Sequence, residues 1–196
     1  MSETTVVKPV KTGKAAVNYG IMFGAIMILE FIIAYAADID PTENAWVGVV
    51  NGVLNNLILP VLFIALAINF FKKANGGYIK LGEALKTGVG VVVIGAAMFA
   101  IFNIIFNLIL PEAQAEMLDK MRAAQLKTNP NMTSEQLKMS MKIVEVFMKP
   151  YVALPFTIMF YAFVGLIYSL IIGAIVKKEN PFGDMQPNEV NNIGAE

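Results

Sequence analysis

Four long apolar segments constrain the fold of this chain more than any other feature of its sequence. They cover residues 16–37, 45–71, 88–110 and 153–176. A helix of roughly 20 apolar residues is long enough to cross a hydrocarbon layer of about 30 Å. Of all residues in the chain, 57% are hydrophobic and 15% are charged, which is typical of a membrane protein rather than of a soluble domain. We therefore predict an all-α integral membrane protein whose four transmembrane helices form a bundle.

The residue types that the chain lacks exclude several kinds of chemistry. It has no cysteine and no histidine, so it offers no disulfide, no thiolate nucleophile, no Cys/His zinc site and no imidazole proton shuttle. Its 15 basic and 15 acidic side chains cancel, so no net field attracts nucleic acid. We expect no cofactor, no metal, no nucleic-acid partner and no enzymatic activity.

The second apolar segment contains a proline, Pro60, near its middle. Proline has no backbone N–H and clashes with the preceding turn, so it bends a helix and leaves one carbonyl without its intrahelical donor. Within a membrane, a neighbouring helix must satisfy that carbonyl. We expect one bent helix here, and the alternative is a hairpin of two short helices.

The positions of the lysines predict the orientation of the four segments, because short lysine-rich flanks stay on the cytoplasmic side. The lysines are Lys8, Lys11 and Lys14 before the first segment, Lys72, Lys73, Lys80 and Lys86 between the second and third, and Lys177 and Lys178 after the fourth. The loop "DIDPTEN" at 38–44 has Asp38, Asp40 and Glu43 and no basic residue. We therefore expect a cytoplasmic N-terminal segment at 1–15, a membrane domain at 16–178 and a disordered cytoplasmic tail at 179–196. Residues 111–150 are then extracytoplasmic.

The first segment also has features of a cleaved signal peptide, namely preceding basic residues and the small residues "AYA" at 34–36. However, its apolar run exceeds the roughly 7 to 15 residues of a signal peptide's hydrophobic region, and Glu30 interrupts it. We therefore expect this segment to remain as a transmembrane helix.

Small and polar residues recur at helical spacing in the other three segments. Membrane helices use such residues where they touch, because lipid provides no hydrophobic drive for association. The predicted inward residues are Gly48, Asn51, Gly52 and Asn55 in the second segment, Ala96, Ala100, Asn103 and Asn107 in the third, and Ala162, Gly165, Ser169 and Gly173 in the fourth.

Seven polar side chains from all four segments are predicted to lie in the outer half of the membrane. At 1.5 Å per residue, Glu30 lies roughly 12 Å below the outer end of its helix, and the others lie roughly 5 to 15 Å below theirs. The seven are Glu30, Asn51, Asn55, Asn103, Asn107, Thr157 and Tyr161. They either join the helices by hydrogen bonds, with Glu30 protonated, or line a pocket that opens to the outside and binds a cation, a proton or a small polar solute.

The connection at 111–150 is predicted to contain two amphipathic helices. Pro111 suits a first helical turn, and Thr133 with Gln136 fits a capping box at the start of the second helix. The helices either cap the bundle or lie in the outer headgroup layer. Methionine sulfurs favour Cu(I), but at helical spacing they are more typical of adaptable packing or of a partner-binding face. The candidate partner face consists of Met117, Met121, Met141, Phe147 and Met148.

The string "NGGYIKLGEALKTG" at 75–88 leads into the third segment. Its glycines lack the spacing of a phosphate-binding loop, and Glu83 is expected near the positive end of a helix. With "TSEQLKM" and "VFMKP" in the outer connection, the chain over residues 14–180 resembles the bacterial membrane family catalogued as domain of unknown function 4199. The motif that carries the resemblance comprises Gly82, Glu83, Ala84, Lys86 and Gly88. The resemblance implies a four-span protein of the bacterial inner membrane and no particular activity.

Three classes of function remain open, of which an intramembrane enzyme is the least favoured. A small chain with two predicted cytoplasmic ends and adhesive outer helices fits an accessory, assembly or scaffold subunit of an inner-membrane complex, with another membrane protein or a second copy as partner. The alternative is a small transporter, channel or sensor with a polar site around Glu30. An intramembrane enzyme is disfavoured, because one buried acid has no second carboxylate, histidine or cysteine to act with.

Overall fold

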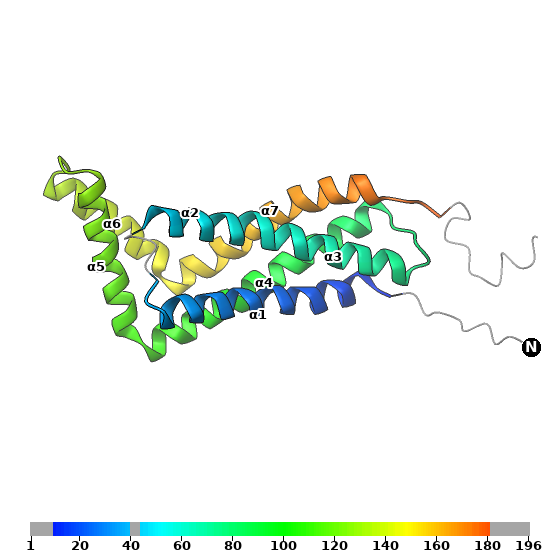
Figure 1. Ribbon diagram of the computed structural model, residues 1–196, viewed down its shortest axis with the longest axis horizontal. Coiled ribbons are helices and arrows are strands. Elements are labelled where there is room, and N and C mark those ends of the chain that lie inside the picture. The colour runs from blue at the N-terminus through cyan, green and yellow to red at the C-terminus, as the bar shows by residue number, and fades with distance from the viewer. Residues whose placement is uncertain (1–9, 40–43, 181–196) are drawn as a thin grey trace, which may run out of the picture.

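The computed structural model describes residues 10–39 and 44–180, and this part of the chain is helical with no strand (Figure 1). The elements are α1 (Thr12–Ala36), α2 (Ala45–Val53), a π-helical turn (Leu54–Ile58), α3 (Leu59–Ala74), α4 (Leu81–Ile109), α5 (Pro111–Thr128), α6 (Ser134–Met148) and α7 (Pro150–Val176). Lys8, Asp40, Glu43 and most of the predicted tail lie outside the described residues.

Four helical stretches are long and apolar enough to cross a membrane, which confirms the predicted number. They are Thr12–Ala36, Trp46–Ala74, Leu81–Ile109 and Pro150–Val176. The second stretch consists of α2, the π-helical turn and α3, which follow one another without a break through Pro60. A hairpin of two short helices, the alternative for this segment, is therefore not formed.

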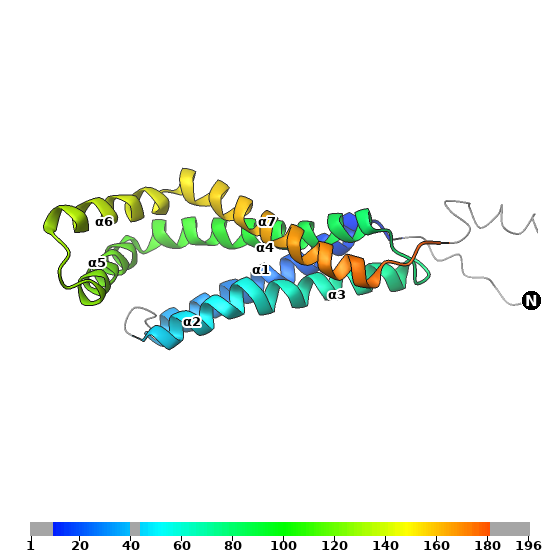
Figure 2. The ribbon, with the colours of Figure 1, turned by 90° about the horizontal axis from the view of Figure 1, so that it is seen from above.

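Helix α4 is the centre of the packing. It lies against α1 on one side and α7 on another, and α3 contacts all three of these helices (Figures 1 and 2). The largest side chains fully enclosed between these helices are Phe23, Ile64, Ile68, Val91 and Val92. Helix α2 does not pack closely on α4 or α7. Its main contact is with the π-helical turn that follows it. The packing is therefore close around α1, α3, α4 and α7 and looser around α2.

Glycines set the separation between α4 and its two main neighbours. A Cβ atom at Gly20 of α1 would lie 2.9 Å from the carbonyl oxygen of Val91, and one at Gly24 would lie 3.0 Å from that of Gly95. On the other side of α4, a Cβ atom at Gly165 of α7 would overlap the Cγ2 atom of Val92. The helices can approach this closely only because these positions carry no side chain.

Burial agrees with three of the four inward residues predicted for α7 and with two of the four predicted for α4. Gly165, Ser169 and Gly173 are buried, and so are Ala96 and Ala100 of α4. Of the remaining predicted residues, Asn51 is exposed. The others are half-buried, namely Gly48, Gly52, Asn55, Asn103, Asn107 and Ala162. None of the four residues predicted for the second segment is buried, because α2 packs only loosely on the other helices.

The two described ends of the chain meet the α3–α4 connection at one end of the molecule. The Asn75 side chain accepts a hydrogen bond from the Val10 backbone N–H and donates one to the Val10 carbonyl, each at 3.1 Å. Ile79 and Lys178 form an isolated antiparallel bridge. The lysines of the three flanks gather at this end, and those described are Lys11, Lys14, Lys72, Lys73, Lys80, Lys86, Lys177 and Lys178.

Helices α5 and α6 lie at the opposite end. Helix α5 runs across the long axis of the molecule, and α6 returns obliquely to the start of α7 (Figures 1 and 2). The Ser140 hydroxyl donates to Oε1 of Gln125 at 2.6 Å and joins the two helices, with Met141 buried between them. Lys120 of α5 lies 3.8 Å from the Asp38 carboxylate just after α1, so α5 passes close to the end of α1.

We expect Gly20→Val to lower the free energy of unfolding by about 1–3 kcal/mol, because the new side chain would meet the α4 backbone, which cannot rotate away. The matched control is Gly52→Val, since a Cβ atom at Gly52 would have no neighbour within 4 Å. The measurement is unfolding of the purified protein in mixed detergent micelles, followed by circular dichroism. Equal stability of the two variants would contradict this view of the α1–α4 contact.

Candidate functional site

A hydrogen-bonded polar group joins α1 to the region where α2 meets the π-helical turn. Nδ2 of Asn55 donates to Oε2 of Glu30 at 2.9 Å and to Oδ1 of Asn51 at 2.6 Å. Glu30 lies near the end of α1, and Asn51 and Asn55 are four residues apart, so they share one face of their helix. The Asn55 amide therefore bridges the Glu30 carboxyl group and the Asn51 amide.

Tyr161 completes this group from α7. Its side chain is buried, and its hydroxyl lies 3.4 Å from the backbone carbonyl oxygen of Asn55, at the long end of hydrogen-bond distance. The Tyr161 ring also meets Phe23 of α1 edge-on, with 6.0 Å between the ring centroids. Four of the seven predicted polar residues therefore come together: Glu30, Asn51, Asn55 and Tyr161.

The other three predicted residues do not join them. The Asn103 side chain donates to the Phe99 carbonyl of its own helix at 3.2 Å. Asn107 and Thr157 are half-buried, and their side chains make no hydrogen bond within the described part of the chain. Aromatic rings fill the contact between α1 and α4 at the end nearest α5; the rings belong to Phe31, Tyr35, Phe99, Phe102 and Phe106.

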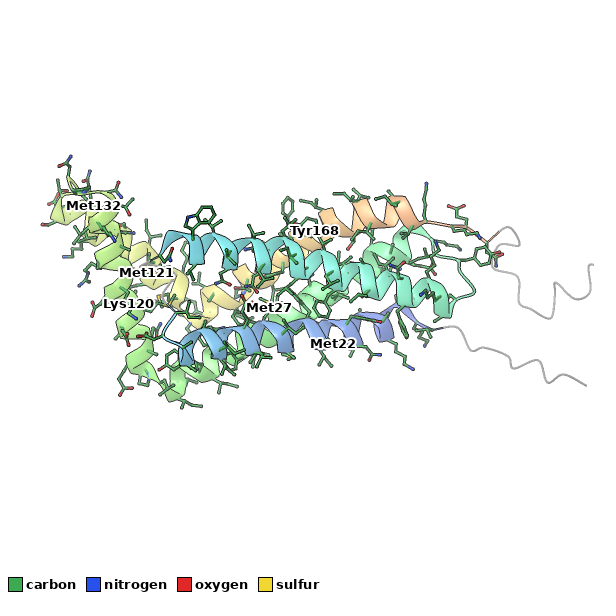
Figure 3. The ribbon with its side chains drawn as sticks, viewed as in Figure 1. Met22, Met27, Lys120, Met121, Met132 and Tyr168 are labelled. Atoms are coloured by element: carbon green, nitrogen blue, oxygen red, sulfur yellow. The ribbon has the colours of Figure 1, made fainter. Side chains whose placement is uncertain are left out.

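Two tyrosines of α7 donate hydrogen bonds to backbone carbonyls near Pro60. The sequence predicts such donors on a helix next to the proline. Pro60 has no N–H to donate to Asn56, the residue four positions earlier. The Tyr168 hydroxyl donates to the Asn56 carbonyl at 2.9 Å, next to the Tyr161 contact at Asn55 (Figure 3). Tyr168 and Asn56 were not predicted from the sequence. The seven-residue spacing of the two tyrosines, which places them on one face of a helix, is the signal that could have found them.

The chemistry of this group favours hydrogen bonding over catalysis or cation capture. The group that meets the Glu30 carboxylate is an amide nitrogen, which does not titrate and does not ligate a cation. The Asn51 side-chain oxygen is already engaged by Asn55. By contrast, the side chains of Asn51 and Asn56 are exposed, and Glu30 is only half-buried. The group therefore presents polar atoms at the surface of an apolar helix.

The residues of the motif at 82–88 have structural roles at the start of α4. Oε2 of Glu83 accepts a hydrogen bond from the Lys80 backbone N–H at 2.8 Å and caps the helix, which therefore begins before residue 88. Ala84 and Gly88 are buried against α7, and a Cβ atom at Gly88 would overlap the Ser169 side chain. Gly82 and Lys86 are exposed.

The candidate partner face of α5 and α6 is divided by the structure. Met117 and Phe147 are exposed, Met121 and Met148 are half-buried, and Met141 is buried, so Met141 packs α6 on α5 and does not meet a partner. The exposed apolar residues of α6 are instead Met139, Ile143, Val146 and Phe147. Their spacing of four, seven and eight residues from Met139 was readable from the sequence.

Comparison with known proteins identifies the family. The profile described as "Protein of unknown function (DUF4199)" matches residues 18–178, so the chain belongs to this family. No curated protein and no solved structure matches the chain.

We expect Tyr168→Phe to lower the free energy of unfolding by about 0.6 to 1.7 kcal/mol, because the carbonyl beside Pro60 loses its donor. In a Pro60→Ala background, the same change should cost less, because the new backbone N–H can bond to the Asn56 carbonyl. Unfolding of the four proteins of this double-mutant cycle in mixed micelles measures the difference. An equal cost in both backgrounds would show that Tyr168 does not compensate for the proline.

Proposed function

We propose that this member of the family of domain of unknown function 4199 is a non-enzymatic accessory or assembly subunit of a complex in the bacterial inner membrane. Its four apolar helices form one bundle, and a helix of another membrane protein or of a second copy covers the polar patch of Glu30, Asn51 and Asn56. Helices α5 and α6 form an amphipathic hairpin on the extracytoplasmic side, and both termini are cytoplasmic.

The distribution of charge supports this orientation. The lysine-rich flanks of α1, α3, α4 and α7 meet at one end of the molecule, which is the arrangement that the positive-inside preference favours for a cytoplasmic surface. At the other end, Asp38 follows α1 in a loop without a basic residue, and the charges of α5 are of both signs. These features support an extracytoplasmic position for the α5–α6 end.

The observation that carries the proposed function is the exposure of amide groups in an apolar span. The Asn56 amide nitrogen bonds to the Gly52 carbonyl of its own helix, and the Asn51 oxygen bonds to Asn55. The Asn51 amide nitrogen and the Asn56 amide oxygen have no partner within the described residues. Leaving such a group in hydrocarbon costs on the order of 2 kcal/mol or more. Polar groups of a partner helix would satisfy both amides.

Enzymatic activity is disfavoured by the surroundings of the one acid in this layer. A general acid or base needs a second group that exchanges protons or activates a nucleophile. The partner of Glu30 is the Asn55 amide, and the chain contains no histidine or cysteine. Glu30 is therefore assigned a role in hydrogen bonding.

A second candidate function, transport or sensing, is favoured by one observation. The carboxyl group of Glu30 is half-buried beside exposed Asn51, so water entering from the extracytoplasmic side would reach both groups. In that case, the polar patch would be wet and would exchange a proton or a small cation with the outside.

We expect a photoreactive benzoylphenylalanine at Asn56 to crosslink to a second polypeptide in intact membranes, because a partner helix covers this position. The matched control is the same residue at Phe163, which is exposed on α7. Glu30→Leu should lower the yield at position 56 severalfold, whereas Glu30→Gln, which keeps a hydrogen-bonding group, should retain it. Equal yields at positions 56 and 163, or no effect of Glu30→Leu, would contradict docking at this patch.

Single cysteines distinguish the two candidate functions, because the chain has none of its own. We expect a membrane-impermeant maleimide applied from outside to label Asp38→Cys and to leave Asn51→Cys and Lys73→Cys unlabelled. Labelling of Asn51→Cys together with Asp38→Cys would favour transport or sensing. Labelling of Lys73→Cys in place of Asp38→Cys would reverse the proposed orientation.

A further inference from the structure

Helix α6 has a second apolar face that its contact with α5 does not use. The face packed on α5 includes Met141, which is buried. The other face, which we call the α6 outer stripe, consists of Met139, Ile143, Val146 and Phe147. Met139 is 70% exposed and Ile143 is 55% exposed. A shallow groove of about 320 Å³ runs along this stripe beside Lys142.

The outer stripe is continuous with the apolar surface of α7. The Phe147 ring meets the Phe156 ring edge-on, with 5.2 Å between the centroids. Phe156 is exposed, and the exposed apolar residues that follow it on α7 are Met159, Phe160 and Phe163. In a helix that spans a membrane, this surface faces lipid. The lipid-facing surface of α7 therefore extends onto α6 without interruption.

Charged and aromatic side chains mark the level of the membrane surface at this junction. Lys138 and Lys142 are four residues apart and lie on one side of α6 next to the outer stripe, and Lys149 follows the last residue of the helix. Lysine stems lie along apolar surface while their ammonium groups reach phosphate groups. Tyr151 is 73% exposed beside Lys149, with 6.0 Å between the ammonium nitrogen and the ring centroid. Such aromatic residues are enriched where transmembrane helices enter the headgroup layer.

We propose that α6 is an interfacial anchor: its outer stripe inserts into the phospholipid leaflet on the α5–α6 side, and the lysine ammonium groups beside the stripe reach the phosphates. A helix with one apolar stripe beside lysines binds a membrane surface in this way. Phe147, next to α7, is the deepest residue of the stripe, and Met139 is the shallowest. This anchor fixes the tilt of the α5–α6 pair against the membrane, whichever leaflet it enters.

Spin labels on single cysteines test this proposal in a chain without native cysteine. The full-length protein is reconstituted alone into vesicles of phosphatidylethanolamine and phosphatidylglycerol, with labels at Met139, Ile143 or Phe147. Controls carry the label at Arg122 or Glu145, which are exposed outside the stripe. We expect the ratio of oxygen accessibility to nickel-chelate accessibility to be severalfold higher at Ile143 and Phe147 than at the controls, and to rise from Met139 to Phe147.

A ratio at Ile143 and Phe147 equal to that at Arg122 would overturn the proposal, because the stripe would then face water. Low accessibility to both reagents, with dipolar broadening between labels, would also overturn it and would show that a second copy covers the stripe. Circular dichroism of each labelled variant confirms that α6 is folded. Because the vesicles contain no other protein and the labels lie on α6, the outcome is independent of docking at Glu30 and Asn56.

Discussion

The close contact of backbones around α4 is the constraint on which the rest of the structure depends. Lipid provides no hydrophobic drive between helices, so their association requires van der Waals contact over a long, smooth surface. Gly20 and Gly24 provide that surface between α1 and α4, and Gly165 provides it between α7 and α4. Where these glycines end, toward α2, the helices separate. The polar patch lies in that region because hydrogen bonds there replace the missing backbone contacts.

Much of the fold was predictable, because membrane thickness fixes helix length and proline chemistry fixes the need for a donor beside Pro60. Rotation of the helices was harder to predict. Small residues occur on several faces of α1 and α4, and the sequence does not rank Gly20 and Gly24 above Ala34 and Ala37 without knowledge of the neighbouring helix. The start of α4 was indicated by Glu83, which was expected near the positive end of a helix and caps it, although the apolar span itself begins only at residue 88.

The candidate site was predictable in part, because the depth of a polar residue along its helix limits which residues of other helices it can contact. Depth along each helix brought Glu30 to the level of Asn55, and their hydrogen bond follows. Depth and helical spacing together placed Asn103 in the group, but its side chain bonds to the Phe99 carbonyl of its own helix. Met141 was assigned to an exposed face, whereas contact with α5 buries it. Which of two apolar faces of α6 packs inward depends on where α5 lies, and periodicity does not determine that.

The hydrogen bonds at the lysine-rich end also have a consequence for biogenesis. Asn75 holds the backbone of Val10, and Ile79 pairs with Lys178, so residues from the first and last parts of the chain meet around the α3–α4 connection. The Asn75–Val10 hydrogen bonds can form once the first two spans have emerged during synthesis, whereas the Ile79–Lys178 bridge can form only after the fourth span. This end of the molecule therefore closes last. Until then, the surface of α4 that α7 later covers is exposed to the insertion machinery.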